Sequence, residues 1–88
     1  MLTTLALLAA SLSPAENALE RSFERCLATR WRAAKASRAS DAHSQTEQIL
    51  DRCYSEAINN RGTVSEDRVI FVIAPAMQRF ASQVRASR

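Results

Sequence analysis

The two cysteines of this chain, Cys26 and Cys53, restrict its possible folds more than any other feature of the sequence. Between them lies a stretch of small polar residues, ASRASDAHS, where the chain is expected to reverse near Ser40. Cys26 would then lie 14 residues before the turn and Cys53 13 residues after it. At about 1.5 Å per residue, both lie roughly 20 Å from the turn on antiparallel helices. The Cα atoms of a disulfide must approach within about 7 Å, so this placement predicts one Cys26–Cys53 disulfide.

The composition favours an all-α fold. The chain has 88 residues, of which 47% are apolar, one is glycine and two are proline. This length allows one domain at most, and scarce glycine and proline with abundant alanine favour helices over a β-sandwich. We predict a single helical domain over residues 16–88, with a disulfide-clamped hairpin over 16–61 and a third helix over 63–87. Because so short a chain buries a modest share of its surface, the tether would supply much of the stability.

The first helix is expected to begin at Pro14 or Glu16 and to end near Arg38. Acidic residues come early in this segment and basic residues come late, which suits the helix dipole. Apolar residues recur at three- and four-residue spacing, which places them on one face: Leu19, Phe23, Cys26, Leu27 and Ala34.

The second helix is expected to follow a cap at Ser40 or Ser44, since Glu47 stands three residues after Ser44 as in a capping box. The sequence NNRG is expected to end it, with Gly62 in the left-handed conformation that glycine adopts without strain. Its apolar face is expected to comprise Thr46, Ile49, Leu50, Cys53, Tyr54, Ala57 and Ile58.

The third segment permits two interpretations. If it is helical, Thr63 and Glu66 have the spacing of a capping box, and Pro75 is expected to kink the helix near Phe71. The alternative is a β-strand over 68–74, because VIFVI is rich in β-branched residues, and that strand would need a partner from a second copy. We favour the kinked helix, whose apolar stripe would comprise Val69, Ile73, Met77, Phe80 and Val84, joined by Ile70, Ala76 and Ala81.

Phe71 and Val72 point away from this stripe in a helix and are expected to be exposed. A two-helix hairpin cannot cover every side of a third helix that is apolar almost all round. Exposed apolar surface of this kind often marks an interface. Two interpretations therefore stay open for these residues: a partner-binding or dimer surface, and simple packing in the core.

The first fifteen residues, MLTTLALLAASLSPA, carry no charged side chain and have an apolar run in their middle. Ser13 and Ala15 fit the small-residue pattern of a secretory cleavage site, so we predict a signal peptide over 1–15 and a periplasmic or secreted protein. A disulfide agrees with export, since such bonds persist in oxidising compartments. The alternative is an apolar extension of the first helix, because Ser13 and Glu16 match a capping box with Pro14 at the first helical position.

No residue pattern in the chain indicates catalysis, a metal or a cofactor. Zinc sites usually take four ligands, often in close cysteine pairs, whereas the single histidine, His43, lies near the expected turn. A single glycine rules out a glycine-rich phosphate loop, and G-x-S-x-G is not present. The carboxylate pairs Glu20 with Glu24 and Glu47 with Asp51 fall on expected solvent faces. We therefore expect no enzyme.

The first helix carries a basic cluster around the tryptophan, formed by Arg25, Arg30, Trp31, Arg32, Lys35 and Arg38. Basic residues beside an aromatic ring can bind nucleic acid or anionic lipid. An exported protein rarely meets nucleic acid, so an anionic membrane or an acidic protein is the expected partner of this face. The alternative is a solvated helix face with Trp31 packed beside Leu27 and Ala34 at the edge of the core.

The aromatic Phe23 before Cys26, the basic alanine-rich helix, the polar turn and the second helix with Cys53 resemble small secreted two-cysteine helical proteins of the Alphaproteobacteria. The resemblance covers residues 16–58 and implies an exported helical protein. The segment RCLATRW is also similar to the tryptophan and arginine near a cysteine in helical periplasmic lysozyme inhibitors, most of which have more cysteines.

These features predict a protein that acts by binding. The first expectation is an envelope protein that binds a protein partner or itself through Phe71 and Val72. A second is a peripheral binder of anionic membranes or other acidic surfaces through the Arg25–Arg38 face. A third is a periplasmic inhibitor-like protein.

Overall fold

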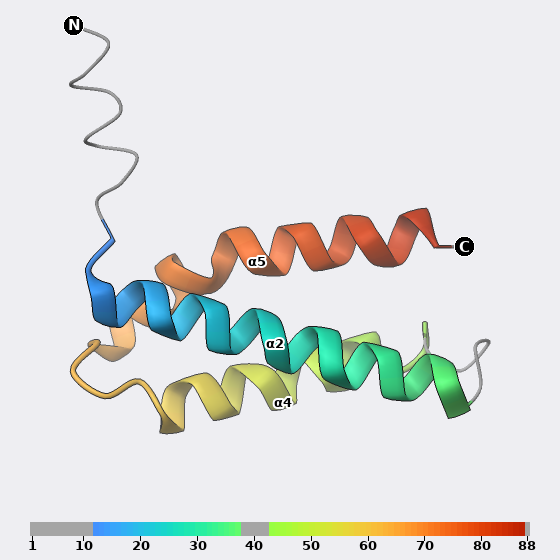
Figure 1. Cartoon of the computed structure of the whole chain (residues 1–88), viewed down its shortest axis with the longest axis horizontal. Helices are drawn as coiled ribbons and strands as arrows, with labels where there is room; N and C mark the ends of the chain where they lie inside the picture. The colour runs from blue at the N-terminus through green and yellow to red at the C-terminus, as the bar shows by residue number, and fades with distance from the viewer. Residues whose placement is uncertain (1–11, 38–42, 88) are drawn as a thin grey trace, which may run out of the picture.

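The computed structural model describes residues 12–37 and 43–87, and over these residues the chain forms three α-helices and no strand. They are α2 (Pro14–Ser37), α4 (Thr46–Asn59) and α5 (Glu66–Ala86). α4 runs antiparallel to α2, and α5 runs back in the direction of α2 (Figure 1). The predicted all-α fold is confirmed, and the alternative of a strand over 68–74 is wrong.

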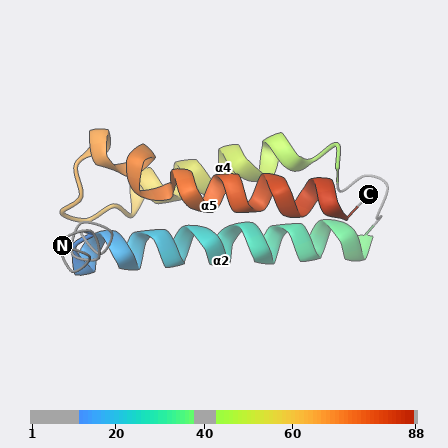
Figure 2. The ribbon, with the colours of Figure 1, turned by 90° about the horizontal axis from the view of Figure 1, so that it is seen from above.

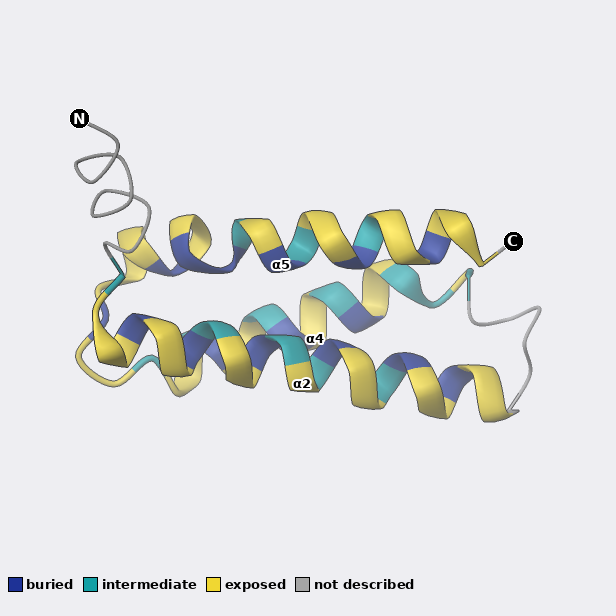
Figure 3. Ribbon diagram, turned by 45° about the horizontal axis from the view of Figure 1, so that its top comes forward, coloured by how far each residue is buried: buried dark blue, intermediate teal, exposed yellow. Residues whose placement is uncertain are grey.

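α2 is the helix against which both of the others pack, with α4 and α5 on the same side of it (Figure 2). Its buried stripe faces that side, while its outer face is exposed along its whole length (Figure 3). Full burial of a large apolar side chain contributes roughly 1.5–3 kcal/mol, so this stripe is a major source of stability. The core comprises Leu19, Phe23, Leu27, Trp31, Ala34, Ile49, Cys53, Ala57, Val64, Val69, Val72, Ile73, Ala76, Phe80 and Val84.

A complete capping box opens α2. The backbone N–H of Ser13 donates to Glu16 Oε1 at 3.0 Å, and the backbone N–H of Glu16 donates to Ser13 Oγ at 3.1 Å. This satisfies donors that a helix start otherwise leaves without partners. Leu12, one residue earlier, packs against the core. Most of the predicted signal peptide, residues 1–11, lies outside the described residues, and cleavage after Ala15 stays a prediction that would remove this cap.

The capping boxes predicted for the other two helices are wrong. α4 has Gln45 at its N-cap and α5 has Ser65, and neither N-cap side chain makes a capping hydrogen bond. Each helix begins one or two residues later than predicted, so Glu47 and Glu66 fall short of the third helical position that a capping box requires. Both carboxylates still lie in the first turn, where the helix dipole favours negative charge. The other predicted cap, Ser40, lies outside the described residues.

The end of α4 is close to its predicted position. The helix ends at Asn59, and the backbone N–H of Asn60 donates to the carbonyl of Glu56 at 2.9 Å. Gly62 has a φ of 59°, which confirms the left-handed conformation. A Cβ at Gly62 would meet no atom within 4 Å, so the backbone conformation alone selects glycine there.

Pro75 lies inside α5, on its exposed side, and the helix is continuous from Glu66 to Ala86. The predicted kink near Phe71 is not shown by the structure. Proline lacks the backbone N–H that would bond to the carbonyl four residues earlier. That carbonyl belongs to Phe71, whose side of the helix faces solvent.

Candidate functional site

The Cys26–Cys53 disulfide joins α2 to α4 as predicted, with the two Cα atoms 5.7 Å apart. Cys53 is fully buried, whereas Cys26 is half-buried. Disulfides persist in oxidising environments, so this bond indicates a location outside the cytosol. None of the described helices combines the length and the hydropathy that a membrane span requires.

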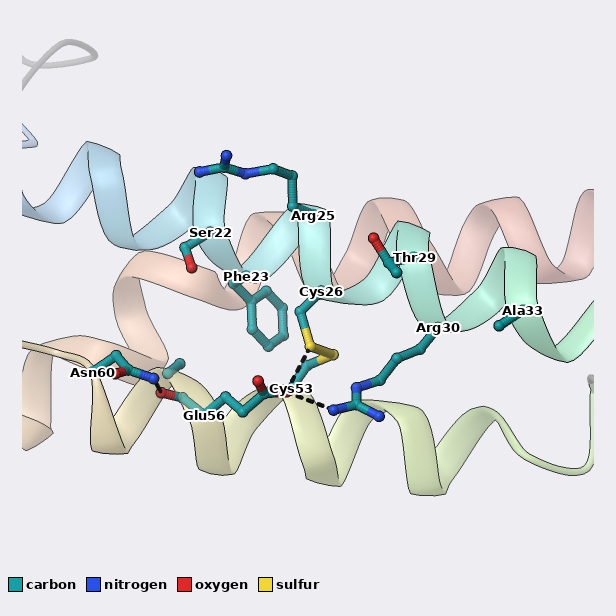
Figure 4. A pocket seen from close by; sticks show the side chains of 11 residues that line it. Ser22, Phe23, Arg25, Cys26, Thr29, Arg30, Ala33, Cys53, Glu56 and Asn60 are labelled. Atoms are coloured by element: carbon teal, nitrogen blue, oxygen red, sulfur yellow. Dashed lines mark hydrogen bonds and ion pairs between the residues drawn. A yellow bond between two sulfur atoms is a disulfide. The ribbon is translucent and has the colours of Figure 1, made fainter.

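A groove with a volume of about 540 Å³ runs along this bond, between α2 and α4 (Figure 4). Glu56 Oε2 lies 3.1 Å from Cys26 Sγ, and Arg30 Nη2 donates to the same oxygen at 2.9 Å. A disulfide sulfur carries no proton and cannot donate a hydrogen bond. Within this group of three side chains, Glu56 therefore accepts its charge-assisted hydrogen bond from Arg30 alone. Sequence reasoning missed Glu56, although its position three residues after Cys53 places both on one side of the helix.

The predicted basic cluster divides into two parts. Arg30 turns into the groove and pairs with Glu56, whereas Arg25 and Arg32 are exposed and form no ion pair with any described residue. Arg38 lies outside the described residues. Sequence reasoning missed Arg21, which is exposed and, by helical spacing, lies on the same face. The exposed positive charges on this face, called the basic stripe below, are Arg21, Arg25, Arg32 and Lys35.

Trp31 does not belong to that surface, and its place among the candidate binding residues is corrected. It is only 5% exposed, and its ring makes edge-on contacts with Phe80, at 5.8 Å between centroids, and His43, at 5.4 Å. Trp31 is buried because its position along the helix places it on the same side of α2 as Leu27 and Ala34. The alternative of core packing is confirmed. Lys35 Nζ lies 5.7 Å from the Trp31 ring centroid, at the edge of this contact.

Of the two candidate residues in the third segment, one is exposed as predicted. Phe71 is 62% exposed, but Val72 is 1% exposed and belongs to the core, so its predicted exposure is wrong. The buried face of α5 includes Val72 and is therefore rotated relative to the predicted apolar stripe. Ile70, expected in the buried stripe, is therefore turned outward and is 56% exposed. Among the described residues, Ile70 and Phe71 are the large apolar side chains that remain exposed.

A chain of contacts holds Phe71 in place. The guanidinium carbon of Arg68 lies 4.6 Å from the Phe71 ring centroid, and Arg68 Nε donates to Glu16 Oε2 at 2.8 Å. In the uncleaved chain, Glu16 is itself held by the capping box with Ser13. The start of α2 therefore positions an exposed aromatic ring on α5, which lowers the entropy that the ring would lose on binding a partner.

The carboxylate of Glu16 is strongly shifted by these contacts. The hydrogen bond from Arg68, followed by that from the Ser13 backbone, lowers the pKa of Glu16 from 4.5 to about 2. The same hydrogen bond raises the pKa of Arg68 above its ordinary value. A group whose pKa falls on folding stabilises the fold above its unfolded pKa, and that contribution is lost as pH falls through the folded pKa.

We expect Glu16→Gln to remove part of the pH dependence of stability. The wild-type urea midpoint should fall more steeply than the variant's between pH 4.5 and pH 2, and the two curves should converge at the acid end of that range. Urea unfolding followed by circular dichroism at a series of pH values measures this. Asp51→Asn, which removes an exposed carboxylate from the middle of α4 that forms no ion pair with the described residues, is the control and should keep the wild-type slope. Parallel curves for wild type and Glu16→Gln would contradict the assignment.

A second depression, of about 580 Å³, adjoins Ile70 at one end of the molecule, where α4 approaches the start of α5. Its apolar lining comes from Tyr54, Ile58 and Ile70, and its acidic lining from Glu66 and Asp67. Neither acidic side chain forms an ion pair within the described part of the chain. This depression, called the α4–α5 pocket below, combines an apolar surface with unpaired negative charge.

The carboxylate pair Glu20 and Glu24 serves as an ion-pair partner. Arg79 on α5 lies 2.9 Å from Glu24 and 3.7 Å from Glu20. One cation thus bridges both carboxylates and ties α2 to α5. Such partly exposed pairs contribute little to stability individually.

Comparison of the chain with protein-family models, with curated proteins and with solved structures finds no match in any of the three.

Proposed function

We propose that this chain is an exported protein-binding module whose partner docks on Ile70, Phe71 and the α4–α5 pocket. The observation that carries the proposal is the adjacency of two exposed large apolar side chains and a pocket with two unpaired carboxylates. Contiguous exposed apolar surface often marks an interaction site. Aromatic side chains held in a fixed position are frequent anchors of protein interfaces.

The residues of this surface indicate which side chains a partner would present to it. Tyr54 and Ile58 suit an aliphatic stem, while Glu66 and Asp67 suit a positive charge at its end. A lysine or arginine beside an apolar residue satisfies both. The partner is therefore a protein segment that presents a basic side chain to the α4–α5 pocket and an apolar one to Phe71. A periplasmic inhibitor would act through a contact of the same kind.

Export rests on three supports. The first fifteen residues have the composition of a signal peptide, and the chain resembles small secreted two-cysteine helical proteins. The Cys26–Cys53 bond requires an oxidising compartment to persist. A periplasmic or secreted envelope protein combines these features.

Photo-crosslinking in the cells that make the protein tests this proposal. Phe71 is replaced by the photoreactive analogue benzoylphenylalanine, which keeps an aromatic ring at the site. We expect a discrete adduct with a separate protein, and we expect the double variant Glu66→Lys, Asp67→Lys to remove at least about nine-tenths of it, because like charges repel a basic partner. Mass spectrometry of the adduct should place the crosslink beside a lysine or arginine of the partner.

The control carries the same analogue at Ser82, which is exposed on α5 farther along the helix. An adduct of equal yield at both positions would mean random collision and would sink the proposal. An adduct with the mass of two copies of this chain would assign the surface to self-association in place of a separate partner. An adduct that survives the charge reversal would remove the basic partner chemistry.

A second candidate function is favoured by the basic stripe on α2. Its four positive charges share one exposed face, and the intervening residues on that face are small, such as Ala28 and Thr29. Without a large apolar side chain to insert, this face would bind an anionic membrane through charge alone. Each basic residue near such a surface contributes about 1 kcal/mol.

We expect the double variant Arg25→Ala, Arg32→Ala to weaken binding to phosphatidylglycerol-containing vesicles about 30-fold, since about 2 kcal/mol is lost. Vesicle sedimentation at low salt measures the affinity, which should fall as salt screens the charges. The control Arg52→Ala, Arg85→Ala removes the same net charge from elsewhere and should bind within about threefold of wild type. Equal losses in both doubles would show a net-charge effect and would refute the stripe.

A further inference from the structure

We propose that the reduced form of this protein binds one thiophilic divalent cation, of the Zn²⁺ class, through Cys26, Cys53 and Glu56. In the oxidised protein the two sulfurs are bonded to each other. One donor atom from each of the three residues, two Sγ and a carboxylate oxygen, lies within 4.8 Å of the others. Two electrons and two protons would therefore free both sulfurs beside this carboxylate. This site is independent of the protein-binding surface on α5.

The donor set selects the metal. Thiolates prefer soft or borderline cations, and two thiolates with one carboxylate suit Zn²⁺, whereas Mg²⁺ and Ca²⁺ prefer oxygen alone. Tetrahedral zinc places its sulfur ligands about 2.3 Å and its oxygen ligands about 2.1 Å from the metal, which sets these donors roughly 3.5–4 Å apart. The two sulfurs, which are bonded to each other in the oxidised protein, would separate to this spacing by side-chain rotation once reduced, and Glu56 Oε2 already lies 3.1 Å from Cys26 Sγ. A water molecule would complete the tetrahedron from the open groove (Figure 4).

The backbone brings the three donors together. Cys53 and Glu56 are three residues apart on α4, so both side chains project from one side of that helix. Cys26 approaches from α2, with its Cα 5.7 Å from that of Cys53. A search of the sequence for cysteine and histidine alone misses this set, because its third member is a carboxylate.

Arg30 has a supporting part in this arrangement. It donates to Glu56 Oε2 at 2.9 Å, and a carboxylate has a second oxygen. The oxygen beside Cys26 Sγ is this same Oε2, so a rotation of the carboxylate would turn Oε1 to the metal while Arg30 keeps Oε2. Neighbours of metal ligands commonly have this orienting role. The guanidinium also offsets the negative charge of two thiolates and a carboxylate around one divalent cation.

Reduction of the disulfide consumes one phosphine and one water molecule. The phosphine takes the oxygen of the water to become a phosphine oxide, and the disulfide gains two electrons and two protons to become two thiols. Binding of M²⁺ then releases both thiol protons to solvent and forms two metal–sulfur bonds. The metal ties α2 to α4 at the point where the disulfide did. It would therefore keep the hairpin clamped before the thiols are oxidised and shield them from oxidation.

Cobalt titration of the reduced protein tests this assignment. Co²⁺ is added to the full chain under anaerobic conditions with a phosphine reductant, and thiolate-to-cobalt charge-transfer absorption is recorded. We expect saturation at one Co²⁺ per chain and displacement by Zn²⁺. Cys53→Ser should abolish the absorption. Glu56→Gln should weaken the affinity for Co²⁺ at least about tenfold. Glu47→Gln, which removes an exposed carboxylate from the first turn of the same helix, should leave the affinity unchanged.

Circular dichroism in the same titration covers the case in which the reduced chain unfolds. In that case the three-ligand site predicts that helix content rises with Co²⁺, because metal binding drives folding, and saturates at the same single equivalent. An affinity that is the same in wild type and Glu56→Gln would mean that two thiols bind alone, and it would overturn the three-ligand site. A complex of two chains per metal, or no charge-transfer absorption, would overturn it as well.

Discussion

Loss of the Cys26–Cys53 disulfide is expected to lower the free energy of unfolding by about 3.5 kcal/mol. The bond closes a loop with a sequence separation of 27, and an unfolded chain without it gains that much conformational freedom. Small domains have about 5–15 kcal/mol of stability in total, so the change removes a large fraction. Urea unfolding of Cys26→Ser, Cys53→Ser and of the reduced wild type, both with a metal chelator present, measures the loss by far-UV circular dichroism.

The double serine variant and the reduced wild type should agree within about 1 kcal/mol, because both lack the same constraint. Each is the other's control: the variant cannot reoxidise, and the reduced protein has the native side chains. A loss below about 1 kcal/mol in both would mean that the helix packing stabilises the fold without the tether. Such a result would also weaken the argument that the chain needs an oxidising compartment to fold.

The fold could be predicted because its strongest constraints are local or covalent. The distance of each cysteine from the polar turn is visible in the sequence, and so is the capping box of Ser13 with Glu16. The phase of α5 could not be predicted, because that segment has apolar residues on nearly every side and its periodicity selects no single face. Packing against α2 and α4 determines which face of α5 is buried, so Val72 lies in the core and Ile70 is exposed.

The candidate sites were harder to predict because contacts between distant residues create them. Glu16 and Arg68 are 52 residues apart, and no spacing rule connects them. Their pairing arises from the return of α5 alongside α2. Arg30 and Glu56 meet because α4 packs antiparallel to α2 beside the disulfide. Trp31 was the opposite case: its charged neighbours suggested a surface, whereas its spacing from Leu27 already placed it in the core.

Trp31→Ala is expected to lower the free energy of unfolding by about 3–5 kcal/mol, the range for truncating a buried aromatic residue. The ring is 5% exposed and contacts Phe80 on α5 and His43 ahead of α4, so its loss opens a cavity where three segments meet. Urea unfolding by far-UV circular dichroism is the measurement, because Trp31 is the only tryptophan and fluorescence would be lost with it. Trp31→Phe, which retains an aromatic ring, should recover more than half of the loss.

The neighbouring substitution Arg32→Ala separates packing from surface binding. Arg32 is exposed, so its removal should change stability by less than about 0.5 kcal/mol while it weakens binding to anionic vesicles. Trp31→Ala should behave in the reverse way, with low stability but vesicle affinity within about twofold of wild type under conditions where it is folded. If Trp31→Ala were stable and lost vesicle binding, the ring would lie on the binding surface after all, and its burial against Phe80 would be wrong.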